Sequence, residues 1–148
     1  MSKVRLQNPV VHTPRLREYM ISSHILRKKL ADLSVILPMG MLDWSYYHTD
    51  MEGWGKVLED LVFKSSLYQA DRFDCDNYAL KAMTLCAERY GLNTLGFVIG
   101  NMPQGRHAFN VLYHGDGFLL WEPNEGFPFS GSTFEIGDFG YQPEWVLM

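Results

Sequence analysis

The sequence predicts an α+β fold in which helices in the N-terminal half precede an antiparallel sheet. Before Gly91, apolar residues recur at helical spacing, whereas after it short runs rich in β-branched and aromatic residues are separated by turn signals. The length of 148 residues is usual for one domain. We therefore expect a single domain over residues 1–148, with the core at about 50–148 and a helical extension over residues 1–48.

The first two helices are predicted from apolar stripes and a capping signal. One helix follows Pro14 and ends near Ser34, because leucine, isoleucine, methionine and tyrosine side chains fall mainly on one face. A second helix covers about residues 50–63. Thr49, with Glu52 three residues later, matches a capping box at its start.

The third helix has the clearest pattern of the chain. Ala, Leu, Met, Cys and Tyr residues form a helical stripe over residues 76–90, and Gly91 stands where a C-terminal cap is expected. Asp74 is the predicted N-cap, so Cys75 lies in the first turn. The unpaired N–H groups of that turn favour a thiolate.

A hairpin between residues 107 and 124 brings three polar residues together. If Gly115 and Asp116 form the tight turn, His107 pairs with Asn124 and lies diagonal to Glu122. All three side chains then share one face of the sheet. Either Glu122 or Asn124 is placed to orient the imidazole of His107.

These residues together suggest thiol chemistry. A nucleophilic cysteine needs a base that is itself oriented by a third group, and the reaction needs donors for an oxyanion. His107 is the candidate base, while the Cys75 N–H group and the side chain of Gln69 are candidate donors. Asp74 and Asp76 act in the opposite direction, because carboxylates repel a thiolate.

Three motifs resemble those of a known superfamily. "FDCDNYAL", "RHAFNVLY" and "LLWEPNEG" are similar to segments of papain-like and transglutaminase-like cysteine peptidases, including bacterial transglutaminase-like cysteine proteinases and the papain-like C-terminal domain of a fungal agglutinin. The resemblance covers about residues 68–126. It implies a papain-like fold, with the nucleophile helix packed on an antiparallel sheet, and a triad of Cys75, His107 and Glu122, with Gln69 at the oxyanion. Arg106 stands where many relatives have glycine.

The resemblance implies a cysteine peptidase or amidase that transfers an acyl group from a peptide, protein or other amide substrate. Amine capture would instead make it a transglutaminase-like acyltransferase, and the sequence does not separate the two. The alternative is a non-enzymatic interaction module, possibly of phage or mobile-element origin, that docks through a basic N-terminal helix. This region contains seven Lys or Arg residues, at positions 3, 5, 15, 17, 27, 28 and 29.

Composition limits the remaining possibilities. A net charge of -4 argues against general nucleic-acid binding, although the basic N-terminal residues leave that reading open. We find no membrane span and no secretion signal, so two reduced cysteines in the cytoplasm are expected. No cofactor is required, and calcium at Asp71 and Asp76 is a further option. Trp44 and the aromatic residues near it either line a substrate cleft or carbohydrate platform or pack in the core.

Overall fold

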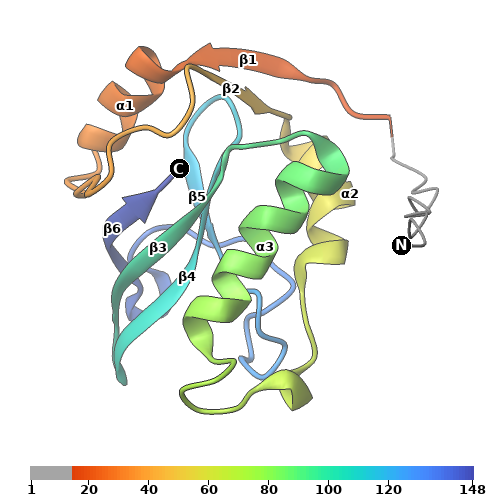
Figure 1. Ribbon diagram of the computed structural model, residues 1–148, viewed down its shortest axis with the longest axis vertical. Helices are drawn as coiled ribbons and strands as arrows, with labels where there is room; N and C mark the ends of the chain where they lie inside the picture. The colour runs from red at the N-terminus through yellow and green to blue at the C-terminus, as the bar shows by residue number, and fades with distance from the viewer. Residues whose placement is uncertain (1–14) are drawn as a thin grey trace, which may run out of the picture.

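The computed structural model describes residues 15–148 (Figure 1). Lys3 and Arg5, and the start of the predicted N-terminal extension, lie outside the described residues. The elements, in chain order, are β1 Tyr19–Ser22, α1 Ser23–Ala31, β2 Ser45–His48, α2 Met51–Leu58, α3 Cys75–Tyr90, β3 Leu95–Met102, β4 Gly105–Tyr113, β5 Phe118–Trp121 and β6 Gln142–Leu147. Short 3-10 helices occupy Glu59–Leu61, Ser65–Leu67 and Asp138–Gly140.

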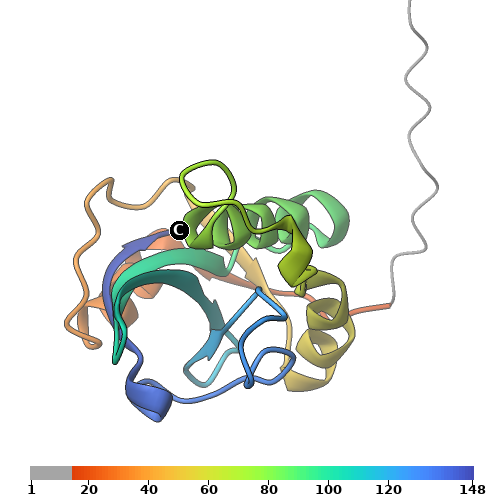
Figure 2. The same ribbon diagram turned by 90° about the horizontal axis from the view of Figure 1, so that it is seen from below.

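The main sheet is antiparallel and has the strand order β5-β4-β3-β6. Figure 2 shows that the sheet is strongly curved, with α3 along its outer side. Two buried clusters cover its two faces. Cys86 and Ala82 of α3 pack with Leu95 and Leu112 on one face, and both faces of β4 are buried from His107 to Tyr113.

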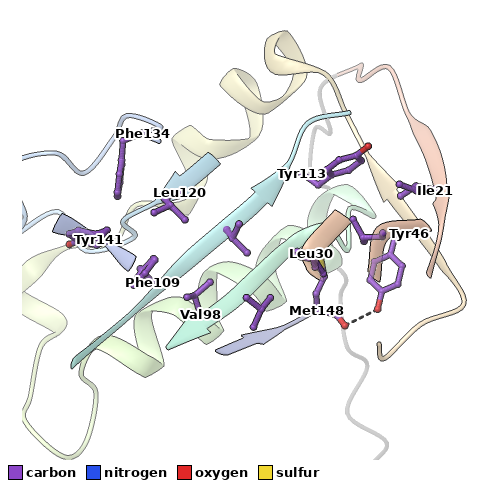
Figure 3. Packing of buried hydrophobic residues seen from close by; sticks show 13 residues of the cluster. Ile21, Leu30, Tyr46, Val98, Phe109, Tyr113, Leu120, Phe134, Tyr141 and Met148 are labelled. Atoms are coloured by element: carbon purple, nitrogen blue, oxygen red, sulfur yellow. Dashed lines mark hydrogen bonds between the residues drawn. The ribbon is translucent and has the colours of Figure 1, made fainter. Parts of the chain in front are cut away.

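The second cluster lies on the other face of the sheet (Figure 3). Leu30 of α1 and Val98 of β3 belong to it, together with Tyr141 from the segment before β6. The hydroxyl of Tyr46 donates a 2.7 Å hydrogen bond to the carbonyl of Met148, the last residue, which fastens the β1–β2 region to the C-terminus. Burial of these large side chains stabilises the sheet through apolar area removed from water.

The prediction of one helix from Pro14 to about Ser34 is wrong in its first part. The residues predicted to begin the first helix instead form β1, which pairs antiparallel with β2 in a separate two-stranded sheet. Only Ser23–Ala31 are helical there, and Ser22 caps that helix by accepting from the N–H group of Ile25. Strands therefore flank α1 on both sides, and the pairing of β1 with distant β2 overrides the local helical spacing.

The second helix is shorter than predicted and has a different cap. It covers Met51–Leu58, and Asp50 rather than Thr49 is its N-cap, with the Asp50 side chain accepting from the N–H group of Gly53. Thr49 is fully buried, and its hydroxyl has no partner within residues 15–148. A carboxylate at the N-cap also complements the helix dipole.

The third helix and the hairpin follow the prediction closely. α3 begins at Cys75, Asp74 is its N-cap, and Gly91 ends it in the left-handed conformation with φ of 67°. Asn110 pairs with Trp121 and Tyr113 with Phe118, and the His114 N–H group donates to the Gly117 carbonyl. This is the predicted hairpin register. Among the described residues no helix is long and apolar enough to span a membrane.

Candidate functional site

The start of α3 lies against the start of β4, which brings Cys75 beside His107. Both residues line a cleft of about 390 Å³. Cys75 is half-buried, whereas Cys86 in the middle of α3 is fully buried. The cleft is lined by Tyr68, Asp74, Cys75, Met102, Gln104, Arg106, His107, Asn124 and Phe127.

His107 is held in place by a buried carboxylate. Its Nε2 atom lies 2.6 Å from Oε2 of Glu122, and the two side chains are 6% and 1% exposed. Asn124 was the alternative partner, but its side-chain oxygen accepts instead from the N–H group of Gly126. Since Nε2 faces Glu122, the other ring nitrogen, Nδ1, is the one available to the thiol of Cys75.

Glu122 itself is held by two further donors. The Tyr141 hydroxyl donates to Oε2 at 3.0 Å, and the backbone N–H group of Asn124 donates to Oε1 at 3.1 Å. Burial and the charge of Glu122 raise the pKa of Tyr141, so its hydroxyl keeps the proton that it donates. The buried carboxylate of Glu122 is therefore held in place from three sides, by His107, Tyr141 and the Asn124 backbone.

The electrostatics of the site favour a thiolate–imidazolium pair. The interaction with His107 is the main cause that lowers the pKa of the Cys75 thiol, against an increase from burial; the Ala108 N–H group lowers it further. Burial lowers the pKa of His107 most, but interactions with Cys75 and Glu122 outweigh it and raise that pKa to about 9. Cys86 differs, because burial raises its pKa to about 12.

Of the two aspartates beside Cys75, Asp74 opposes the thiolate as the sequence predicted. A hydrogen bond between their side chains lowers the pKa of Asp74 and raises that of Asp76. The charge of Asp74 then raises the pKa of Cys75, but less than His107 lowers it. In the described part of the chain, Asp71 and Asp76 do not belong to any group of three His, Cys, Asp or Glu side chains able to hold a metal ion. Calcium binding there stays a prediction.

Gln69 is a predicted site residue that the structure leaves outside the cleft. It is exposed, in a turn where its N–H group donates to the Phe73 carbonyl and its own carbonyl accepts from Phe73. Gln69 does not line the cleft, whereas Gln104 does. Its role as an oxyanion donor stays a prediction.

Two residues of the site have at most a weak signal in the sequence. Tyr141 reaches Glu122 from 19 positions away, and the Phe127 ring packs 4.9 Å from the ring of His107, measured between centroids. Both come from segments without helical or strand periodicity. Only the tertiary fold places them, although an isolated aromatic residue in a polar loop is a weak hint of such a contact.

The comparisons with known proteins point to lectins. The family model described as "Ricin-type beta-trefoil lectin C-terminal domain" matches residues 6–136. None of the curated proteins matches the chain.

Two solved structures resemble the fold. One is titled "PSL1a-E64 complex", with 18% identity and a TM-score of 0.58, covering 87% of this chain and 51% of that one. The other is Polyporus squamosus lectin bound to the human-type influenza-binding epitope Neu5Aca2-6Galb1-4GlcNAc, with 15% identity and a TM-score of 0.57, covering 87% and 49%. The chain thus spans about half the length of these structures.

These findings correct the assignment to papain-like and transglutaminase-like cysteine peptidases, both as family and as fold. The family match covers most of the chain, whereas the motif resemblance covered about residues 68–126. They also overturn the predicted peptidase or amidase function and the peptide, protein or amide partners. The motifs led to the wrong family because a group of cysteine, histidine and carboxylate side chains recurs on unrelated folds. Such local chemistry does not identify a family.

Proposed function

Since the chain belongs to the family of ricin-type beta-trefoil lectin C-terminal domains, we propose that it is an interaction module of a glycan-binding protein. The family match over residues 6–136 is the observation that carries this proposal. The solved lectin bound to a sialylated trisaccharide supports a glycan as the class of partner. A net charge of -4 makes nucleic acid a poor partner by comparison.

Calorimetric titration of the chain with Neu5Acα2-6Galβ1-4GlcNAc and with lactose tests this proposal. We expect saturable heat for at least one of them, at the millimolar to micromolar affinities usual for small polar ligands in open sites. Maltose is the control for unspecific sugar effects. Absence of saturable binding to any glycan would remove the proposal.

The cleft supports a second candidate function, an activated thiol. We propose that Cys75 acts as a nucleophile, with His107 as its acid–base partner and Glu122 as the orienting group. The observation that favours it is the buried His107–Glu122 pair at 2.6 Å, next to a thiol whose pKa is lowered. In such a site the thiolate adds to an electrophilic carbon of a double bond, the π electron pair moves to the other atom of that bond, and the imidazolium gives its proton to that atom.

Differential alkylation tests this second candidate. Iodoacetamide should label Cys75 much faster than an ordinary thiol at neutral pH, because only the thiolate reacts. Cys86, buried and with a pKa raised to about 12, is the internal control. Equal and slow labelling of both cysteines in the folded protein would rule out an activated thiol.

The free state of both thiols supports the prediction of a reducing compartment such as the cytoplasm.

A further inference from the structure

Among the described residues that line the cleft of Cys75, Arg106 alone carries a permanent positive charge. It directly precedes His107 at the start of β4. The sequence sets Arg106 apart, because it stands where many of the similar motifs have glycine. A side chain of this size and charge in the lining of the cleft influences which molecules reach the thiol.

The guanidinium of Arg106 is fixed by two neighbouring residues of β6. Its Nη1 atom donates to Oε2 of Glu144 at 2.8 Å, and its Cζ atom lies 5.5 Å from the centroid of the Trp145 ring, within the range of a cation–π contact. β4 and β6 both flank β3, so the arginine reaches across the middle strand. A guanidinium held in this way loses little side-chain freedom when a ligand binds it.

Glu144 leaves much of the binding capacity of Arg106 unused. A guanidinium has five N–H donors, and Glu144 contacts only one terminal nitrogen; among residues 15–148 no other acceptor contacts Arg106. The two side chains are 50% and 39% exposed. Ion pairs this exposed contribute little to stability, so a second carboxylate can share the guanidinium at small cost.

The other fixed charges around the thiolate disfavour an anionic ligand. Asp74 also lines the cleft, and a hydrogen bond with Asp76 lowers its pKa, so it carries a negative charge. The carboxylate of Glu122 lies 2.6 Å from the imidazole of His107 and offsets the positive charge of that ring. A molecule with a carboxylate is therefore repelled from the cleft unless it pairs with Arg106.

We propose that Arg106 is the specificity-determining residue of the cleft and selects electrophiles that carry a carboxylate. The planar fork of a guanidinium matches a carboxylate through two parallel N–H bonds, which a neutral group cannot reproduce. The carboxylate binds Arg106 while the electrophilic carbon lies at the sulfur of Cys75. This inference rests on the activated thiol proposed above, since it names the class of substrate for that site.

Two alkylating reagents that differ in charge test the inference. Iodoacetate carries a carboxylate where iodoacetamide carries an amide, and the two share size and leaving group. With either reagent the Cys75 thiolate forms a C–S bond, the C–I bond breaks, and iodide leaves with the electron pair. The ratio of the two rate constants cancels any change in the amount of thiolate, so it reports recognition of the charge alone. Peptide mass spectrometry measures both rates.

Three variants complete the test. Arg106→Gln should lower the ratio of the iodoacetate rate to the iodoacetamide rate by roughly three- to fivefold at low salt, as expected for the loss of one half-exposed charged contact. Arg106→Lys should keep part of the selectivity, because lysine retains the charge without the fork. Arg89→Gln is the matched control: it removes the same charge from an exposed position in the last turn of α3, about 21 Å along the helix axis from Cys75, and should leave the ratio unchanged.

The outcomes separate the inference from the activated thiol. If iodoacetamide labels Cys75 fast but the ratio is the same in Arg106→Gln as in the parent, the inference fails while the activated thiol stands. An equal fall of the ratio in Arg89→Gln would show an effect of net charge and would also overturn the inference. If the parent labels Cys75 as slowly as Cys86, the activated thiol fails, and the inference fails with it.

Discussion

Replacing Glu122 by Gln should remove the charge that keeps His107 protonated. The carboxylate is 1% exposed and lies 2.6 Å from Nε2 of His107, so its charge acts at short range and with little screening. Without it, burial is opposed only by the interaction of His107 with Cys75, so the pKa of His107 falls from about 9 toward its ordinary value. At pH 8 a pKa of about 9 corresponds to a protonated fraction of about nine-tenths, and each unit by which that pKa falls lowers the ratio of protonated to neutral imidazole tenfold.

The pKa of the Cys75 thiol should rise as a result, because the interaction with His107 is the main cause that lowers it. With a neutral imidazole, burial and the charge of Asp74 raise that pKa and only a small fraction of the thiol ionises. We therefore expect Cys75 alkylation in Glu122→Gln to be at least about tenfold slower than in the parent at pH 8. Iodoacetamide labelling followed by peptide mass spectrometry measures the rate.

The control for this experiment is Glu125→Gln. Glu125 is an exposed carboxylate nearby that accepts from the N–H group of Ser65 at 2.9 Å, and its loss should leave the rate unchanged. Circular dichroism checks that both variants fold. A Glu122→Gln protein that is folded and alkylated at the parent rate would refute the claim that Glu122 sets the charge of the site.

Three further predictions concern stability and the neighbours of the cleft. Asn110→Ala should lower the free energy of unfolding by about 2–4 kcal/mol in urea titrations, because the buried amide donates to Ala79 of α3 at 2.9 Å and to Gly96 of β3 at 3.0 Å; a loss under about 0.5 kcal/mol would contradict this. Tyr141→Phe should shift the pH profile of Cys75 alkylation, since the Glu122 oxygen that faces His107 loses its second donor, and an unchanged profile would show that the hydroxyl is dispensable. The raised pKa of His107 stabilises the fold fully below pH 6.5, and that stability is lost as the pH rises through about 9. In Cys75→Ala only Glu122 still raises that pKa, so the unfolding free energy should fall above pH 6.5 over a range that ends below about pH 9, and this fall should vanish when His107→Gln is added.

Local signals predicted the part of the fold that carries the cleft. The apolar stripe and terminal glycine of α3 and the tight turn at Gly115 depend on neighbouring residues only. The turn sets the strand register, and the register places His107 near Glu122. Each step uses contacts close in sequence, so the sequence was sufficient for them.

Prediction from local sequence signals failed where the structure depends on contacts between residues far apart in the chain. β1 has four residues and pairs with β2, so that Tyr19 faces His48. The apolar residues of β1 fall at helical spacing in the sequence, which led to the prediction of a helix. The contact of Tyr141 with Glu122 depends on the path of a loop. The family was also misjudged, because a triad motif reports local chemistry whereas family membership is carried by the whole chain.

The most direct test of the central claim is binding of the labelled chain to a glycan microarray. The account predicts specific retention on a subset of the glycans, which free glycan of the same kind competes away. A chain that is folded by circular dichroism yet binds no glycan on the array would contradict the proposal that it is an interaction module for glycans.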